Sequence, residues 1–329
     1  MRLLVTGGAG YVGGHTVRAL LDAGHDVTVY DNLVYGHRET VPCELEVGEL
    51  ADRRKLDALF ARARDASRPY DAVLHFAAYA YVGESVAEPS KYWRNNVAAG
   101  LELLDAMRAH GVDRLVFSST CAVYGPPTRL PIDENERKAP ESPYGESKLT
   151  FEQVLHSYAT AYGLRSVSLR YFNAAGARPD GSLGEDHDPE THLIPLVLRA
   201  AAGRSPGVKV FGTDYPTPDG TCVRDYVHVD DLASAHLLAL GAMETPSACL
   251  TYNVGTGRGY SVREIIEACR TVTGREIAVV EGPRRPGDPP ELYADNRHIR
   301  EALGWTPHYT DAEAIVRTAW AWHARQSIH

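Results

Sequence analysis

Residues 2–14 read Arg-Leu-Leu-Val-Thr-Gly-Gly-Ala-Gly-Tyr-Val-Gly-Gly, and this stretch decides the fold class. A short apolar run typical of a strand passes directly into Gly7, Gly10 and Gly13, and a helical pattern follows to about Leu21. Glycines at this spacing allow a tight strand-to-helix turn, where backbone N–H groups and the helix dipole favour a phosphate group. A glycine cluster alone is more often a simple loop, but the flanking strand and helix favour a dinucleotide-binding turn.

The end of the next apolar run indicates which dinucleotide is bound. Residues 27–30 read as a strand, and Asp31 and Asn32 follow it. A carboxylate at this place can accept both ribose hydroxyls of an adenosine and would repel a 2′-phosphate. We therefore expect NAD and not NADP, although Arg38 is near enough in sequence to leave the alternative open. Ordinary turn residues are the other interpretation of Asp31 and Asn32.

Beyond this turn, apolar runs alternate with helical periodicity, which indicates β-α units and a parallel sheet. We expect strands near 2–6, 26–30, 71–76, 114–118 and 165–170, and helices near 12–23, 52–66, 90–110 and 143–162. After residue 175 the pattern is less regular, with helices expected near 192–202, 230–243, 262–273 and 311–325. The fold class is therefore α/β, a Rossmann-type doubly wound parallel sheet with a smaller, interleaved C-terminal α/β substrate domain.

The length of 329 residues is enough for more than one minimal domain. We expect a nucleotide-binding domain over residues 1–174, to which segments near 208–240 return. A second domain, mainly for substrate binding, is expected over residues 175–329.

Composition excludes several classes of partner. A formal net charge of −9 argues against a nucleic-acid or anionic-membrane surface, so local arginines must hold any anionic ligand. The five cysteines form no C-x-x-C pair and no metal-ligand spacing, which fits a reducing compartment and predicts no metal. The chain begins with a strand and not a signal peptide, and no stretch approaches ~18 continuous apolar residues. We expect a cytoplasmic protein.

A candidate base lies in the run Ser-Pro-Tyr-Gly-Glu-Ser-Lys at 142–148. Tyr144 and Lys148 are four residues apart, which places them on one face of a helix. A fixed cation lowers the pKa of a phenol from its usual ~10, so Tyr144 can take a proton from a hydroxyl group. Thr120, at the hydroxyl-rich end of a strand, can hydrogen-bond the same oxygen. Taken alone, these features are also typical of a solvated helix face and of a self-capping strand end.

In this order and spacing, these residues resemble the extended short-chain dehydrogenase/reductase superfamily. More narrowly, the chain resembles the UDP-glucose 4-epimerase family, through runs in register along nearly its whole length. These runs are HFAA at 75–78, VGESV at 82–86, NNV at 95–97, LRYFN at 169–173, HLIP at 192–195, FGTDYPT at 211–217, VRDYVHV at 223–229 and RRPGD at 284–288.

The resemblance implies roles for individual residues. NAD would be held at its pyrophosphate by Gly7, Gly10, Tyr11, Val12 and Gly13, and at its adenosine half by Asp31, Asn32, Glu49 and Leu50. The rest of the cofactor site would be Phe76, Ala77, Ala78, Asn96, Ser118, Tyr144, Lys148 and Tyr171. The UDP-sugar would be bound by Thr120, Tyr144, Asn173, His192, Leu193, Phe211, Arg224, Arg285 and Asp288. A planar guanidinium suits the oxygens of a diphosphate.

The resemblance also implies the reaction, reversible C4 epimerisation of UDP-glucose and UDP-galactose. Tyr144 would remove the C4 hydroxyl proton, with Thr120 and Lys148 as its catalytic partners, while a hydride passes to NAD. The 4-keto sugar would then turn and receive the hydride on its opposite face. A homodimer is implied as well.

Several alternatives stay open. The substrate could be another UDP-sugar, namely UDP-GlcNAc or UDP-GalNAc, UDP-glucuronate or a UDP-pentose, and a catalytically silent NAD-binding sensor shares the same fold. Nucleotide-sugar dehydratases carry extra acid/base groups where this chain has Cys121 and Ala122, which disfavours elimination.

Three departures from the family pattern affect details. Glu49 stands where many relatives have an aspartate near the adenine, and Ala80 where some have a lysine near the phosphates. Leu292 falls near a wall position at which a bulky aromatic in some relatives restricts the C2 substituent of the sugar. A leucine predicts some turnover of UDP-N-acetylgalactosamine, unless a shift of register places Tyr293 there.

Overall fold

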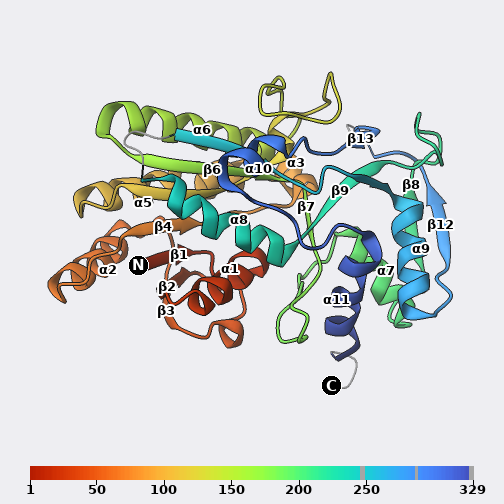
Figure 1. The fold of residues 1–329 in the computed structure, drawn as a ribbon, viewed down its shortest axis with the longest axis horizontal. Coiled ribbons are helices and arrows are strands. Elements are labelled where there is room, and N and C mark those ends of the chain that lie inside the picture. The colour runs from red at the N-terminus through yellow and green to blue at the C-terminus, as the bar shows by residue number, and fades with distance from the viewer. Residues whose placement is uncertain (245–248, 286–287, 326–329) are drawn as a thin grey trace.

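A computed structural model describes residues 1–244, 249–285 and 288–325 (Figure 1). Its main sheet contains β1 (Arg2–Thr6), β2 (Asp26–Asp31), β3 (Glu44–Val47), β4 (Ala72–His75), β5 (Arg114–Thr120), β6 (Arg165–Tyr171) and β10 (Cys249–Val254). The strand order is β10-β6-β5-β4-β1-β2-β3, and every neighbouring pair is parallel. This order reverses direction beside β1, as in doubly wound sheets, and confirms the expected fold class.

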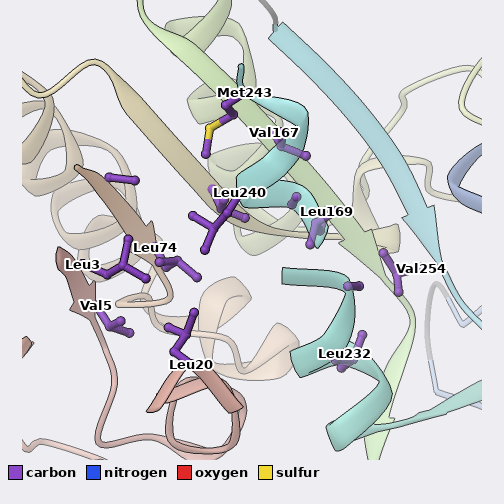
Figure 2. Close-up of a cluster of buried hydrophobic side chains, with 14 of the residues drawn as sticks. Leu3, Val5, Leu20, Leu74, Val167, Leu169, Leu232, Leu240, Met243 and Val254 are labelled. Carbon is purple, nitrogen blue, oxygen red and sulfur yellow. The ribbon is translucent and has the colours of Figure 1, made fainter. Parts of the chain in front are cut away.

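Alternation along β1 shows why helices cover both faces of the sheet. Leu3 and Val5 belong to one buried cluster, and Leu4 belongs to another. Helices α1 (Tyr11–Asp22) and α8 (Val229–Ala242) complete the first cluster, which Figure 2 shows in part. Helices α2 (Arg53–Asp65), α5 (Ala99–Ala109) and α6 (Pro143–Tyr162) complete the second. A parallel sheet buried on both faces needs such continuous apolar strands.

The second unit is smaller and mixed. Its strands are β7 (Asn173–Ala175), β8 (Val208–Phe211), β9 (Val223–His228), β11 (Gly259–Ser261), β12 (Val279–Gly282) and β13 (Glu291–Leu292). One sheet runs β11-β9-β13 with β7 also paired to β9, and β12 pairs with β8 separately. Helices α7 (Leu193–Ala201), α9 (Val262–Thr273) and α11 (Ala312–Arg325) share a third buried cluster with these strands.

The chain crosses between the units more than once. After β9 in the second unit, α8 packs on the first and β10 forms an edge of the main sheet. Helix α10 (Arg297–Leu303) also adds Ile299 to the core of the first unit. We therefore propose a Rossmann domain over residues 1–174 and a second domain mainly over residues 175–329. Of the segments near 208–240 that were expected to return to the first domain, β8 and β9 lie in the second unit, and it is α8 and then β10 that return.

Most predicted elements are present within one or two residues, and the differences are local. The predicted helix near 90–110 consists of α4 (Pro89–Tyr92), a π-helical stretch at Trp93–Ala98 and α5. Helix α3 (Val82–Ala87), strand β3 and the strands from β7 onward, including β10 of the main sheet, were not predicted. Helix α3 is short, and β3 is a four-residue edge strand with two glutamates. Among the described residues, no helix is both long and apolar enough to span a bilayer.

A buried ion pair joins α6 to the main sheet. The Nε atom of Arg170 donates to Oε1 of Glu152 at 2.9 Å, and these side chains are only 6% and 9% exposed. Ser119 donates to the same carboxylate at 2.6 Å. Tyr124 accepts from Arg170 at 2.9 Å and donates to Asn253 on β10 at 2.7 Å. The network connects β5, β6, β10 and α6 directly below the polar strand ends.

We expect Glu152→Gln to lower the free energy of unfolding by about 3–5 kcal/mol, because it leaves a buried guanidinium without its countercharge. Urea unfolding at neutral pH measures the change. Glu102→Gln is the matched control, since Glu102 lies 3.8 Å from Arg53 with 43% of its side chain exposed. It should cost less than about 1 kcal/mol. Equal effects of the two substitutions would contradict a stabilising role for the buried pair.

Candidate active site

The glycine turn between β1 and α1 is shaped by contacts that leave no room for side chains. Gly7 has φ of +74°, and a Cβ there would lie 2.4 Å from the backbone nitrogen of Ala77. A Cβ on Gly13 would lie 2.2 Å from the carbonyl oxygen of Gly7. At Gly10 the one atom within 4 Å of such a Cβ is the Gly7 oxygen at 3.5 Å, an ordinary van der Waals contact. The turn is therefore too tightly packed for a side chain at Gly7 and Gly13, but not at Gly10.

The first turn of α1 fits a pyrophosphate. Gly10 caps the helix without a side-chain hydrogen bond, and no acidic residue lies in the first turn. Backbone N–H groups at such an end are available to an anion, which the helix dipole also favours. The Tyr11 hydroxyl instead donates to the carbonyl of Gly176 at 2.6 Å, and Val12 packs on the core of the first unit. Tyr11 and Val12 can thus offer this ligand their backbone N–H groups.

Asp31 lies at the end of β2, beside the glycine turn. Its carboxylate accepts the backbone N–H groups of Ala9 at 3.0 Å and Leu33 at 2.8 Å. Burial raises the pKa of Asp31, and these hydrogen bonds oppose the rise. The amide of Asn32 donates to the Glu49 carboxylate at 3.1 Å. The structure thus brings Asp31, Asn32 and Glu49 together at one edge.

Leu50 and the loop after β4 border the same region. Leu50 is 5% exposed in the second buried cluster. The Phe76 ring lies 4.6 Å from that of His236 in α8, and the backbone of Ala77 packs on Gly7. Ala78 follows on the same loop and is partly buried. These contacts fix the loop against the glycine turn.

Asn96 connects this loop to α6. Its amide nitrogen donates to the Tyr79 carbonyl at 3.0 Å and to the Ser147 hydroxyl at 3.1 Å. Its oxygen accepts from the backbone of Tyr79 at 2.9 Å. The side chain is buried and its hydrogen bonds go to the protein, so its main effect is to position the loop and α6.

Tyr144 lies in the first turn of α6. Ser142 caps the helix by accepting from the backbone of Gly145 at 3.2 Å, and Pro143 occupies the first helical position. One turn later, Lys148 donates to the carbonyl of Ser118 on β5 at 2.8 Å. Its ammonium lies 6.0 Å from the centre of the Tyr144 ring. The predicted pair therefore shares one face of the helix, directed at the end of β5.

The pKa values of Tyr144 and Lys148 differ from the expected ones. Burial raises the pKa of Tyr144 well above its usual value, and a hydrogen bond with Thr120 acts in the opposite direction. Burial also lowers the pKa of Lys148 to about 7, while Glu152 acts to raise it. The expectation that the pKa of the Tyr144 phenol is lowered beside Lys148 is thus wrong for the protein alone. Burial favours the neutral form of both side chains.

The other side chains at the strand ends form hydrogen bonds with near neighbours. Ser118 and Tyr171 share a hydrogen bond, and burial raises the pKa of Tyr171 to about 12. Thr120 accepts from the backbone of Ala122 at 3.1 Å, so it caps its own strand end as well as meeting Tyr144. Burial raises the pKa of the Cys121 thiol to about 12. Cys121 is therefore a neutral wall residue at neutral pH.

The predicted substrate residues of the second unit lie on several elements. Arg224 on β9 contacts Asp288 and donates to the Pro289 carbonyl at 2.8 Å. The guanidinium of Arg285 lies 4.2 Å from the centre of the Phe211 ring at the end of β8. The structure thus places these arginines near apolar and acidic neighbours.

Three more predicted substrate residues lie on β7 and at the start of α7. Asn173 on β7 donates to the Asp225 carbonyl at 3.0 Å, and Leu193 is the first residue of α7. His192 lies 2.8 Å from Glu185 and 3.0 Å from Glu190. Burial would lower the pKa of His192, but these carboxylates raise it to about 10. The sequence did not predict the role of either glutamate, because both lie in an irregular loop. Residues of such a loop have no helical or strand periodicity that would show which side chains meet.

The register of β13 is also clear. Leu292 packs with Cys121 and Phe172, whereas the Tyr293 ring lies 3.3 Å from the Cβ position of Gly259. Neighbouring residues of a strand point to opposite sides. Leu292, and not Tyr293, therefore lies on the side of the buried cluster that Cys121 also contacts.

Comparison with known proteins places this geometry in a family. Residues 3–255 match the model of the NAD dependent epimerase/dehydratase family. A UDP-glucose 4-epimerase from Lacticaseibacillus casei is 49% identical over 325 residues, which are 98% of this chain and 97% of that protein.

Two solved structures agree along the whole chain. UDP-glucose 4-epimerase from Brucella ovis in complex with NAD has a TM-score of 0.92 at 50% identity, covering 97% of each chain. The enzyme from Bifidobacterium longum in complex with NAD+ and UDP has a TM-score of 0.92 at 37% identity, covering 99% of each chain. The family model spans most of the chain, and a relative is 49% identical over 98% of it, so this chain belongs to the NAD dependent epimerase/dehydratase family.

Proposed function

We propose that the protein interconverts UDP-glucose and UDP-galactose by inversion at C4, with tightly bound NAD and with Tyr144 as the base. The observation that carries this proposal is the meeting of Tyr144, Thr120 and Lys148 at the strand ends beside the glycine turn. The neighbours Cys121 and Ala122 offer no acid/base group for elimination. The relatives named above as UDP-glucose 4-epimerases support the same reaction.

The residues of the first unit fit NAD. Backbone N–H groups from Gly10 to Gly13 would hold the pyrophosphate, and Asp31 with Asn32 and Glu49 would hold the adenosine half. Lys148, Tyr171 and Ser118 border the side where the nicotinamide half would lie. When bound, NAD takes the C4 hydride and returns it to either face of the 4-keto sugar.

Tyr144 and Thr120 would handle the proton of the C4 hydroxyl. To accept the C4 proton, Tyr144 must first be in its phenolate form, which burial disfavours and the hydrogen bond with Thr120 favours. The phenol formed in this way would return the same proton when C4 is reduced. Lys148, with its pKa near 7, supplies a titratable positive charge on the same helix face.

The second unit would anchor the nucleotide part of the substrate. Arg224 and Arg285 present guanidinium groups that match diphosphate oxygens, and the Phe211 ring offers an apolar surface. Asp288 orients Arg224, and Asn173, His192 and Leu193 would complete the site. Because these groups would hold UDP, the hexose is free to turn between its two faces. We also propose a homodimer through the helices near 90–110 and 143–162.

Incubation with UDP-galactose tests the reaction directly, with UDP-glucose as the expected product. Tyr144→Phe should lower kcat by about 10²–10⁴-fold, since a positioned acid/base group contributes that much. Tyr162→Phe is the matched control, because Tyr162 lies on the same helix with 52% exposure and should keep the wild-type kcat. No epimer from the wild-type protein with NAD still bound would overturn the proposed reaction, and an unchanged kcat in Tyr144→Phe would overturn the role of this residue.

Gly13→Ala should weaken NAD retention by about tenfold or more, because the new Cβ would displace the turn and ~1.4 kcal/mol is a factor of ten in affinity. Nucleotide released on denaturation measures the retained NAD per chain. Gly241→Ala serves as the control, since a Cβ there meets nothing within 4 Å. Full retention by Gly13→Ala would show that the turn does not hold the cofactor.

The position of Leu292 predicts that the protein also accepts a substrate with an N-acetyl group at C2 of the sugar. The protein should convert UDP-N-acetylgalactosamine more slowly than UDP-galactose, because a leucine leaves room beside the C2 substituent. Leu292→Tyr should abolish the former activity and keep the latter, measured as product formed from each substrate. Complete rejection of the acetylated substrate by the wild-type protein at saturating concentration would contradict this prediction.

A further inference from the structure

A second cluster of chemically active side chains lies outside the proposed catalytic residues. Glu185, His187, Glu190 and His192 belong to the segment between β7 and α7, and one donor atom from each lies within 4.8 Å of all the others. In Figure 1 this segment is green and lies between α1 and α11. Two imidazoles and two carboxylates are a donor set typical of zinc and similar divalent ions.

The spacing of the donor atoms fits such an ion. Donors bound to a tetrahedral zinc at about 2.0–2.2 Å lie roughly 3.3–3.5 Å from one another. Here Nδ1 of His187 lies 3.2 Å from Glu185 and 3.8 Å from Glu190. Nδ1 of His192 lies 2.8 Å from Glu185 and 3.0 Å from Glu190. Small adjustments of side chains would bring all four atoms to bonding distance.

One carboxylate oxygen of the cluster is buried and makes no hydrogen bond. The Glu190 side chain is 0% exposed, and its Oε2 atom lies 3.8 Å from Nδ1 of His187. This Oε2 atom has no hydrogen bond with any of the described residues, whereas Nδ1 of His187 also lies 3.2 Å from Glu185. Buried polar atoms are normally satisfied, so a buried carboxylate oxygen that faces an imidazole without a hydrogen bond indicates a missing ligand.

We propose that Glu185, His187, Glu190 and His192 bind one divalent transition-metal ion, with Zn²⁺ as the best match. The ion would have a structural role, because four protein donors close the coordination sphere. The proposal does not depend on the proposed function: the metal would take Nδ1 of His192, and the Nε2 atom of the same ring stays available to the UDP group.

Such an ion would fasten the segment at the junction of the two units. The His187 ring lies 6.1 Å from that of Tyr11, the first residue of α1. The Glu185 carbonyl accepts from the Trp322 indole on α11 at 3.2 Å. His37 contacts the carbonyl of Asp186 at 3.2 Å. Metal binding would therefore tighten contacts beside the glycine turn as well as across the units.

The test is zinc binding by the full chain after chelation. The protein is treated with EDTA, dialysed and titrated with ZnCl₂, and bound metal is measured by elemental analysis together with the melting temperature. We expect one zinc per chain and a higher melting temperature. Glu190→Gln should weaken zinc binding at least about 100-fold, since losing even an outer-shell partner of a ligand costs about 10–100-fold.

Asp188→Asn is the matched control, because this exposed neighbour loses the same charge on the same loop and should bind zinc as the wild type does. His187→Gln provides a second ligand variant should Glu190→Gln fail to fold. Absence of stoichiometric zinc in the wild type would overturn the proposal. Equal zinc affinity in the wild type and a folded ligand variant would overturn it too.

Discussion

The close approach of two backbone segments, at Gly7 and Ala77, is the constraint on which the rest of the site depends. The ends of β1 and β4 are neighbours in the sheet, so the turn after one strand packs on the loop after the other. That loop continues to Tyr79, which Asn96 ties to Ser147, and Ser147 donates to the carbonyl of Tyr144 at 2.7 Å. A continuous chain of contacts thus relates the candidate cofactor turn to the candidate base. Small residues at the first contact permit the whole arrangement.

Dehydration sets the charges at the strand ends. Burial moves the pKa of Tyr144 upward and that of Lys148 downward, so both groups tend toward their neutral forms in the protein by itself. The Glu152 carboxylate of the same helix is buried too, and it accepts hydrogen bonds from Arg170 and Ser119. Helix α6 therefore contributes Glu152 to a structural ion pair with Arg170 of β6, and it carries Tyr144 and Lys148, which are poised to gain or lose a proton. Their difference comes from hydrogen bonding, which stabilises charge where burial alone does not.

Most of the main sheet could be predicted from sequence because its strands are continuous apolar runs between turns. The site residues on strand ends and on the first turn of α6 could be predicted for the same reason, since parallel strands end at one edge. Strand β3 escaped prediction because Glu44 and Glu46 make an edge strand resemble a loop. The cluster of His192 and Glu185 was not predicted, because an irregular loop brings its side chains together. The course of such a loop has no periodicity that can be recognised in the sequence. The charge of Tyr144 depends on burial, which spacing does not reveal.

The late return of α8 and β10 to the main sheet affects how the chain acquires its structure during synthesis. Leu232 and Leu240 on α8 cover the same face as Leu3 and Val5 at the N-terminus. Until residues beyond 250 leave the ribosome, that face has only α1 to cover it, and apolar surface near β5 and β6 stays in contact with water. The nascent chain is then a candidate client for chaperones, although its first 174 residues contain nearly all of the sheet. Completion of the nucleotide-binding half thus waits for the synthesis of much of the second unit.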